Sequence, residues 1–185
     1  EGEEYHTSLL AITELLKYGT TTFMDPGSTK FLGRCLDAYR QAGCRIIVGT
    51  HVTDRPNPLT LPVSSTADAV KTVEAVIREF DGQLDGRVRA WAMPFSPGVC
   101  SDELLTECKR LADQYGTGLT LHYNNGQNYT DTTLKESGLR PTQYLAKLGI
   151  LGNNVTLSHM LGQDESEVAV LAGTGTRAVV VPTAA

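Results

Sequence analysis

The chain has 185 residues, of which 41% are hydrophobic and 20% charged, and its formal charge is −5. This composition is that of a globular domain and excludes a disordered chain, while the acidic balance provides no basic surface for nucleic acid or an acidic membrane. No apolar run approaches the ~20 residues needed to span a bilayer. The four cysteines form no CxxC pair and are expected to be buried free thiols. We therefore expect no nucleic-acid partner, no membrane segment and a cytoplasmic location.

Helix-type and strand-type patterns alternate from the first residues onward. Apolar residues at helical spacing predict a helix over 5–18, which Gly19 ends, and a β-branched run predicts a strand over 20–25. The expected elements that follow are a helix over 29–42, a strand over 45–51, a proline-rich loop over 54–65, a helix capped by Thr66, a strand over 88–94, a helix begun by Ser101, a strand over 118–124, a long loop, a helix begun by Pro141, a strand over 155–159, a helix capped by Asp164 with Glu167, and a strand over 177–182.

Six short strands alternating with six helices predict a parallel sheet covered by helices. A doubly wound sheet would favour a glycine-rich phosphate turn after an early strand, and Asp25-Pro-Gly-Ser-Thr is not such a turn. Several polar residues and prolines are expected at the carboxyl ends of the strands, the ends that face the active site in a barrel. These residues are Asp25, His51, Pro94, His122, His159 and Pro182. The predicted fold is therefore α/β, a (β/α)₈ TIM-type barrel with about six β/α units in this chain.

Three of the four histidines, His51, His122 and His159, are expected at strand ends. For any one of them, an imidazole bonded to backbone explains the position as well as a functional role does. His122 and His159 end adjacent strands, so their imidazoles are expected to converge on the barrel mouth. Because no HExxH or CxxC motif is present, the residues alone give a moderate indication of a metal site.

The run Leu119-Thr-Leu-His-Tyr-Asn-Asn125 resembles the fifth-strand motif of the amidohydrolase superfamily, in its cytosine-deaminase and triazine-hydrolase-like branch. Val155-Thr-Leu-Ser-His159 resembles the sixth-strand histidine motif of that branch. Further runs resemble its second strand, its fourth-strand loop, the helix before strand six and strand seven; they cover 18–25, 94–105, 138–151 and 181–183. The resemblance implies that His122 binds a divalent metal, and that His159 orients or activates the metal-bound water or binds a second metal. The expected cofactor is one divalent ion, zinc first, with iron, cobalt or manganese as alternatives.

In the same family, the first strand carries a His-x-His pair and the eighth strand an aspartate, all of them metal ligands. Neither strand is recognisable in this sequence. We therefore expect residues 1–185 to be a partial hydrolase barrel that lacks the first and last strands and the flanking β-sandwich. Its expected partners are a small-molecule substrate, the missing segments or a companion chain, and further copies in a homo-oligomer.

Asn125 stands where deaminases of this family carry a glutamate, three residues after the fifth-strand histidine. A carboxamide cannot carry a proton between water and a ring nitrogen. The sequence therefore favours hydrolysis of a urea, carbamate or thiocarbamate, as in phenylurea and molinate hydrolases, over the alternative of purine, pyrimidine or triazine deamination. The candidate catalytic residues are His159 and Asn125, and the candidate substrate-binding residues are Phe95, Tyr123 and His51.

Three other interpretations stay open. Asn125 is also explained as a turn residue in Asn124-Asn-Gly126. Trp91 suits an apolar substrate pocket or the core, and the core is favoured for an alternating strand residue. The whole chain could also belong to a non-catalytic barrel that binds ligands, and the metal content of the intact protein would separate this class from an enzyme.

Ala184-Ala185 stands where relatives carry Ser-Asn after the strand-seven proline, another departure from the deaminase pattern.

Overall fold

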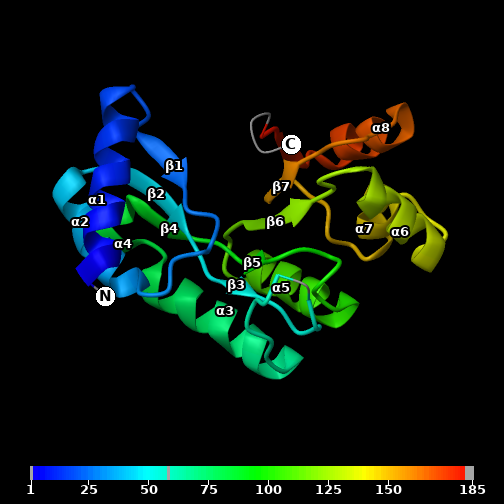
Figure 1. The fold of residues 1–185 in the computed structure, drawn as a ribbon, viewed down its shortest axis with the longest axis horizontal. Helices are drawn as coiled ribbons and strands as arrows, with labels where there is room; N and C mark the ends of the chain where they lie inside the picture. The colour runs from blue at the N-terminus through cyan, green and yellow to red at the C-terminus, as the bar shows by residue number, and fades with distance from the viewer. Residues whose placement is uncertain (1, 58, 182–185) are drawn as a thin grey trace.

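The computed structural model describes residues 2–57 and 59–181, so the expectations for Pro182 to Ala185 lie outside the described residues. Strands and helices alternate along most of the chain (Figure 1). In chain order the elements are α1 (Gly2–Lys17), β1 (Thr22–Met24), α2 (Leu32–Ala42), β2 (Arg45–Val48), β3 (His51–Val52), α3 (Thr66–Phe80), α4 (Gln83–Gly86), β4 (Val88–Ala90), β5 (Met93–Pro94), α5 (Asp102–Gln114), β6 (Leu119–Tyr123), α6 (Gln127–Ser137), α7 (Pro141–Lys147), β7 (Val155–His159), α8 (Glu165–Thr174) and β8 (Arg177–Val179).

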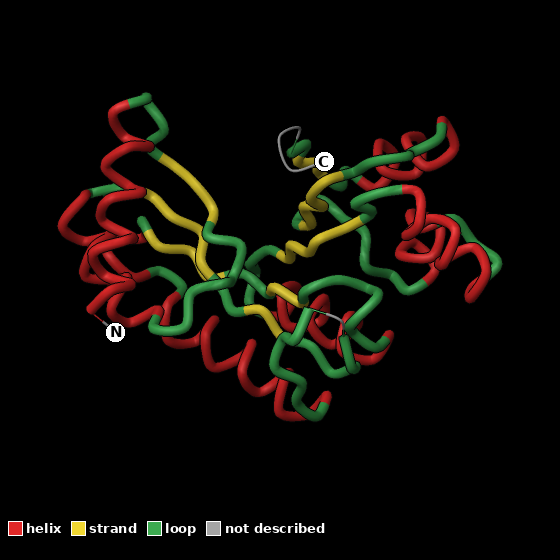
Figure 2. The backbone as a smooth tube through the Cα atoms, in the orientation of Figure 1, coloured by secondary structure: helices red, strands yellow, loops and turns green. Residues whose placement is uncertain are grey.

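Among the described residues, the strand pairings are all parallel and follow the order of the chain. The pairings form the series β1-β2-β4, β3-β5 and β6-β7-β8. A bridge between Ala92 and Leu119 joins the β4–β5 path to β6, and His122 N donates to Phe95 O at 2.8 Å. The strands therefore follow one another along a single arc. Figure 2 shows them along the concave side of this arc, with helices on the outside.

The two ends of the arc are open edges within the described part of the chain. There, β1 pairs only with β2, and β8 pairs only with β7. The three residues of β8 are all exposed. A sheet of six successive parallel strand paths with helices outside and two unpaired edges is the arrangement of an incomplete barrel.

The second helix begins later than predicted, at Leu32 rather than near residue 29. The hydroxyl of Thr29 donates instead to the carboxylate of Asp25, which holds the turn after β1. Glu4 of α1 accepts from Lys30 N at 3.1 Å and from Phe31 N at 2.7 Å. A carboxylate supplied from another helix thus serves the start of α2, a contact that no local pattern reveals.

The strands predicted over 45–51 and 88–94 are each divided into two segments, which corrects the expectation of two continuous strands. Trp91 N still donates to Val48 O at 2.8 Å, whereas the next amide, Ala92 N, donates to Gly118 O at 2.9 Å. The backbone there changes its partner from β2 to the start of β6. A Cβ on Gly118 would lie 2.3 Å from Trp91 Cδ2, so the indole packs against the glycine. Trp91 is therefore a packing residue.

The connection after β6, predicted as a long loop, contains α6. Its sequence is largely polar and its one buried residue is Thr130, so it carries no apolar stripe to predict a helix. The short α4 was also not predicted. Ser101 as the N-cap of α5 and Pro141 at the start of α7 agree with expectation. The expected cap of α3 was wrong: Ser65 is the N-cap and accepts from Asp68 N, while the hydroxyl of Thr66 donates to Asp54 Oδ2.

The sequence also predicted buried, free cysteines and no membrane-spanning segment. The four cysteines, at positions 35, 44, 100 and 108, are free and buried, as predicted. Within the part of the chain that the structure describes, no helix has the length and apolar character needed to cross a membrane.

Candidate active site

His122 and His159 lie together at the carboxyl ends of β6 and β7. His122 Nδ1 is 3.1 Å from His159 Nε2, and the two ring centroids are 5.4 Å apart. The parallel register places His122 opposite Ser158 and Tyr123 opposite His159, so the two histidines are diagonal neighbours. The convergence expected from the sequence is therefore present.

The backbone that carries His159 adopts a conformation that residues other than glycine rarely take. His159 has φ +77° and Met160 has φ +57°, and Asn124 at the end of β6 has φ +38°. Met160 N donates to Tyr123 O at 3.3 Å, and Leu161 N donates to Asn124 O at 2.9 Å. Backbone strain of this kind persists only where surrounding contacts fix it, and it gathers at functional sites.

Burial favours the neutral form of His122 and His51. The pKa of His122 is lowered, first by burial and then by the neighbouring His159. The pKa of His51 falls to about 4, again mainly through burial, with a smaller contribution from His122. Neutral imidazole is the form that binds metal ions. His122 can therefore offer a ring nitrogen to a cation at neutral pH.

One atom of the pair lacks a partner. His159 Nδ1 is buried and has no hydrogen-bond partner among the described residues. Buried polar atoms are normally bonded, so such an atom indicates a further ligand or water at the site. Within residues 2–57 and 59–181, no cluster of three or more His, Cys, Asp or Glu side chains could hold a metal ion. The donor chemistry of His122 and His159 fits a divalent metal, although two imidazoles are fewer than the three protein ligands that a catalytic site usually has.

Phe95 and His51 pack beside this pair. The Phe95 ring centroid is 4.7 Å from that of His122 and 4.8 Å from that of His51. His51 begins β3 rather than ending a strand, which corrects the expectation, and its amide donates to Gly27 O at 2.9 Å. It faces a small cavity of about 20 Å³ that also contacts His122 but not His159. His51 thus lies on the far side of His122 from His159.

A pocket of about 220 Å³ opens over the histidine pair. It is lined by Leu59, Phe95, Ser96, His122, Tyr123, Asn124, Asn125, Tyr129 and His159. Five of the six predicted site residues are among them, and His51 is the exception. Asn125 is exposed at this pocket, whereas Asn124 is buried and its amide donates to Thr130 Oγ1 at 3.0 Å. The side chain of Asn124 is therefore hydrogen-bonded within this turn.

Residues 1–183 match the amidohydrolase family. The chain belongs to the amidohydrolase family. The predicted family and the predicted barrel fold are both confirmed. Among curated relatives of this amidohydrolase chain, the 5-methylthioadenosine/S-adenosylhomocysteine deaminase of Syntrophobacter fumaroxidans is 29% identical over 175 residues, which cover 95% of the chain and 38% of the relative. The chain thus spans well under half of that protein.

Solved structures share the fold. Atrazine chlorohydrolase from Arthrobacter aurescens TC1, complexed with zinc, superposes with a TM-score of 0.83 at 19% identity, over 96% of this chain and 42% of that one. An adenosine deaminase from Xanthomonas campestris with bound zinc superposes with a TM-score of 0.76 at 25% identity, over 95% of this chain and 38% of that one. The first likeness establishes the fold alone.

Tyr123 has a different environment from the one expected of a substrate contact. Its hydroxyl lies 2.6 Å from Thr142 Oγ1 on α7, in a buried layer behind β6, and burial raises the pKa of this phenol. Successive strand residues point to opposite faces, so Tyr123 points away from the imidazole of His122. Tyr123 contacts the pocket while its hydroxyl is engaged elsewhere.

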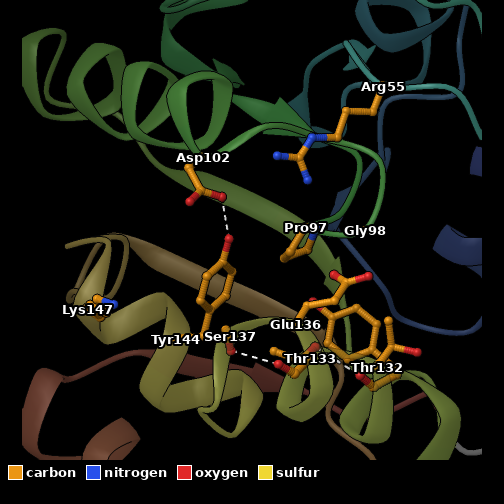
Figure 3. Close-up of a pocket in the computed structure, with 11 residues that line it drawn as sticks. Arg55, Pro97, Gly98, Asp102, Thr132, Thr133, Glu136, Ser137, Tyr144 and Lys147 are labelled. Atoms are coloured by element: carbon orange, nitrogen blue, oxygen red, sulfur yellow. Dashed lines mark hydrogen bonds between the residues drawn. The ribbon is translucent and has the colours of Figure 1, made fainter.

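The sequence did not indicate Tyr129, which lies on the unpredicted α6. Tyr129 lines the histidine pocket and also a second cavity of about 460 Å³ between the loop after β5 and helices α6 and α7. Figure 3 shows Tyr144 of α7 pointing across this second cavity and donating its hydroxyl to Asp102. Arg55 points into the same space (Figure 3). The pocket over the histidine pair and this second cavity therefore adjoin each other at Tyr129.

Proposed function

We propose that the protein to which this chain belongs is a metal-dependent hydrolase that cleaves a non-peptide carbon–nitrogen bond of a small molecule. The observation that carries the proposal is the His122–His159 pair, which lies at the pocket with one buried nitrogen lacking a partner among the described residues. Membership of the amidohydrolase family supports it.

In this proposal His122 holds the metal ion through an imidazole nitrogen, and the remaining ligands come from outside the described residues. Zinc is the metal we propose, because two solved relatives carry it, and iron, cobalt and manganese are the alternatives. The chemistry that a bound divalent ion supplies is Lewis-acid activation of water at neutral pH. The lowered pKa of His122 keeps its ring available for this role.

His159 is the proposed proton carrier. Its Nδ1 is free of partners among the described residues, and its other ring nitrogen is 3.1 Å from His122. If His122 binds the metal through Nε2, its Nδ1–H would donate to His159 Nε2, so His159 would take up a proton at Nε2 when this contact opens, while Nδ1 keeps its own proton. Phe95 and Tyr129 form aromatic walls of the pocket, which would exclude water from the reacting atoms.

For the substrate, we propose an amino-substituted heteroaromatic ring of the purine or triazine type. Both the curated relative and one solved relative are named deaminases of adenine nucleosides or related compounds. The comparisons thus favour the alternative that the sequence had ranked second, and the preference for ureas and carbamates has no support among them. With an amide at position 125, proton transfer to the ring falls to His159.

A urea or carbamate remains the second candidate because of one observation. Asn125 is at the exposed edge of the pocket, where its amide can donate to or accept from a substrate but cannot carry a proton. Such a group suits a carbonyl substrate polarised by a metal better than it suits a ring that needs protonation.

The test is a substrate panel on the full-length, metal-loaded protein. Aminopurine nucleosides, aminotriazines, aryl ureas and alkyl carbamates are supplied in parallel, with release of ammonia and of organic amine followed separately. Ammonia from a ring compound is the expected result. Amine from ureas or carbamates alone would replace the first candidate with the second. No turnover, together with no bound divalent metal, would contradict both and point to a non-catalytic barrel.

A further inference from the structure

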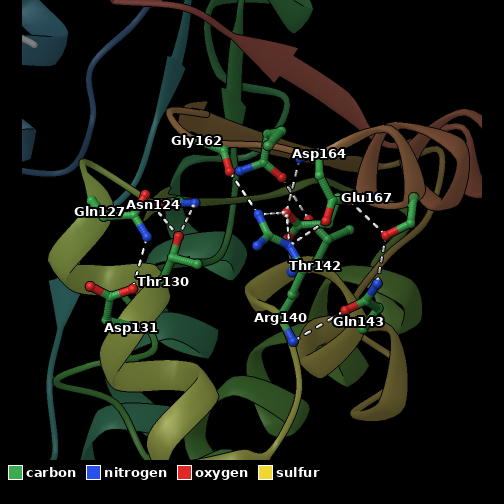
Figure 4. Close-up of polar contacts among 12 residues, drawn as sticks. Asn124, Gln127, Thr130, Asp131, Arg140, Thr142, Gln143, Gly162, Asp164 and Glu167 are labelled. Atoms are coloured by element: carbon green, nitrogen blue, oxygen red, sulfur yellow. Dashed lines mark hydrogen bonds and ion pairs between the residues drawn. The ribbon is translucent and has the colours of Figure 1, made fainter.

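Glu167, on the first turn of α8, is a charged residue with 0% exposure. Its Oε1 accepts from Thr142 N at 2.9 Å, and its Oε2 accepts from Arg140 Nε at 2.8 Å and from Asp164 N at 3.3 Å. Figure 4 shows these contacts converging between α7 and α8. The carboxylate therefore joins the start of α7 to the start of α8.

Arg140 extends this contact to the loop between β7 and α8. Its Nη2 donates to Gly162 O at 2.8 Å and lies 2.7 Å from Glu167 Oε2, and its Nε is 2.8 Å from Asp164 Oδ2. The guanidinium of Arg140 thus binds Gly162 and Asp164 on the loop and the carboxylate of Glu167. The planar fork of arginine permits this, and a lysine ammonium could not reproduce it.

The loop that Arg140 binds follows His159, the last residue of β7. His159 and the first loop residue, Met160, have left-handed backbone, which is unfavourable and needs contacts on both sides to persist. On the β6 side, Met160 N and Leu161 N donate to backbone oxygens. On the other side are the contacts of Arg140 and Glu167.

A second connection links the same helix to the strand of His122. Thr142 Oγ1 lies 2.6 Å from the hydroxyl of Tyr123 and donates to Gln163 Oε1 at 2.9 Å. Since Glu167 accepts from Thr142 N, the carboxylate also orients the residue that spans β6 and the β7–α8 loop.

We infer that Arg140 and Glu167 are positioning residues for His159, which hold its strained backbone so that its ring stays beside that of His122. The inference rests on the proposed function, in which His159 takes part in turnover. Stability alone explains the pair poorly, because taking the Glu167 carboxylate out of water is costly even with a guanidinium, itself 25% exposed, beside it. The pair also binds Gly162 and Asp164 and so fixes the position of the β7–α8 loop. Apolar residues in the same place could not make these contacts.

The test uses the full-length protein with Arg140→Met and Glu167→Leu combined, so that no charge is left buried without its partner. We expect the melting temperature of this double variant to fall, because Thr142 N and Asp164 N lose their acceptor, so kcat and the histidine distance are compared well below it. Turnover on the best panel substrate should fall about 10–100-fold, the usual effect of losing support behind a metal-site residue, with KM changing less than kcat. A crystal structure of the variant should show a longer distance between His122 Nδ1 and His159 Nε2.

The matched control is Arg110→Met with Glu107→Leu, which removes another arginine–glutamate pair, on the surface of α5, with an Nε–Oε2 distance of 2.8 Å. It should change neither kcat nor the histidine geometry. If the first double variant does not fold, Arg140→Lys keeps the charge beside Glu167 but cannot bind all three points, and it should show the same kcat loss.

Unchanged kcat and an unchanged histidine distance in a folded variant would overturn the inference. If the wild-type protein turns over no panel substrate, the proposed function fails separately. The distance in the variant crystal structure then decides the inference alone: a longer distance supports it and an unchanged one overturns it.

Discussion

His122 Nδ1 lies 3.1 Å from His159 Nε2, although the two residues are 37 positions apart in the chain. Parallel pairing of β6 with β7 brings them together, and the left-handed backbone at His159 sets the direction of the second ring. The contact therefore depends on the surrounding fold. The packing of the strands and the protonation of the buried histidines can both be tested by substitution.

The packing of Trp91 on Gly118 predicts a large effect from a small substitution. A Cβ at position 118 would lie 2.3 Å from Trp91 Cδ2, within a rigid ring that cannot move aside locally. Gly118→Ala should lower the free energy of unfolding by about 1–3 kcal/mol through overpacking. Chemical denaturation of the full-length protein measures it.

The matched control for this substitution is Gly33→Ala in α2, where a Cβ would meet nothing within 4 Å. Its free energy of unfolding should stay the same or rise by up to about 1 kcal/mol, since alanine is the better helix residue. Equal effects at the two positions would contradict the packing of Trp91 described above.

Burial of His51 predicts how stability depends on pH in the metal-free protein. The pKa of His51 is about 4 in the folded chain, against 6.5 ordinarily, so between these pH values the unfolded chain binds more protons. Stability should therefore fall as pH is lowered from 6.5 to 4. The difference corresponds to roughly 3 kcal/mol.

His51→Gln should remove much of this slope, measured by denaturation at a series of pH values after metal chelation. His6→Gln on exposed α1 is the control and should leave the slope as it is. A slope that His51→Gln does not change would show that His51 is protonated normally in the folded protein.

Much of the fold was predictable because its determinants are local. The strand over 155–159 and the capping box of Asp164 with Glu167 agree with expectation, since β-branched runs and capping residues are short-range signals. The division of the strand over 45–51 was not predictable. At Gly49 a Cβ would lie 2.5 Å from Met93 Cγ, a contact between residues distant in sequence.

The same distinction applies to the site. His122 and His159 were identifiable because they end recognisable strands. Tyr129 was not, because α6 has no apolar stripe. The backbone of His159 was not either, because a left-handed conformation outside glycine depends on tertiary contacts such as those of Met160 N and Leu161 N with the end of β6.

The open edges of the arc predict that residues 1–185 alone self-associate. Within the described residues, β1 and β8 each have one unpaired side, and Val179 and Val180 are 43% and 65% exposed. Unprotected edges of this kind invite pairing with other chains. Sedimentation at several concentrations should show association, and Val179→Lys should reduce it. A monomer that unfolds cooperatively would contradict this prediction.

Asn125 predicts a gain from one substitution. If the substrate is an amino-substituted ring, Asn125→Glu supplies a proton-carrying group at the pocket edge and should raise ammonia release. The gain should be about 10²-fold or less, the lower end of what general acid–base help contributes. Asn125→Gln places an amide of the same length as glutamate at this position and should give no gain. A fall in activity with glutamate would instead favour a carbonyl substrate, whose developing negative charge a carboxylate repels.

The most direct test of the account is the metal content of the full-length protein, measured beside its turnover for the wild type, His122→Ala and His159→Ala. The wild type should hold about one divalent ion per active site. His122→Ala should lose both metal and turnover, whereas His159→Ala should keep most of the metal and lose turnover. Equal metal loss in both variants would indicate a binuclear site. Retention of metal and activity by His122→Ala would contradict the assignment of the metal site and the mechanism built on it.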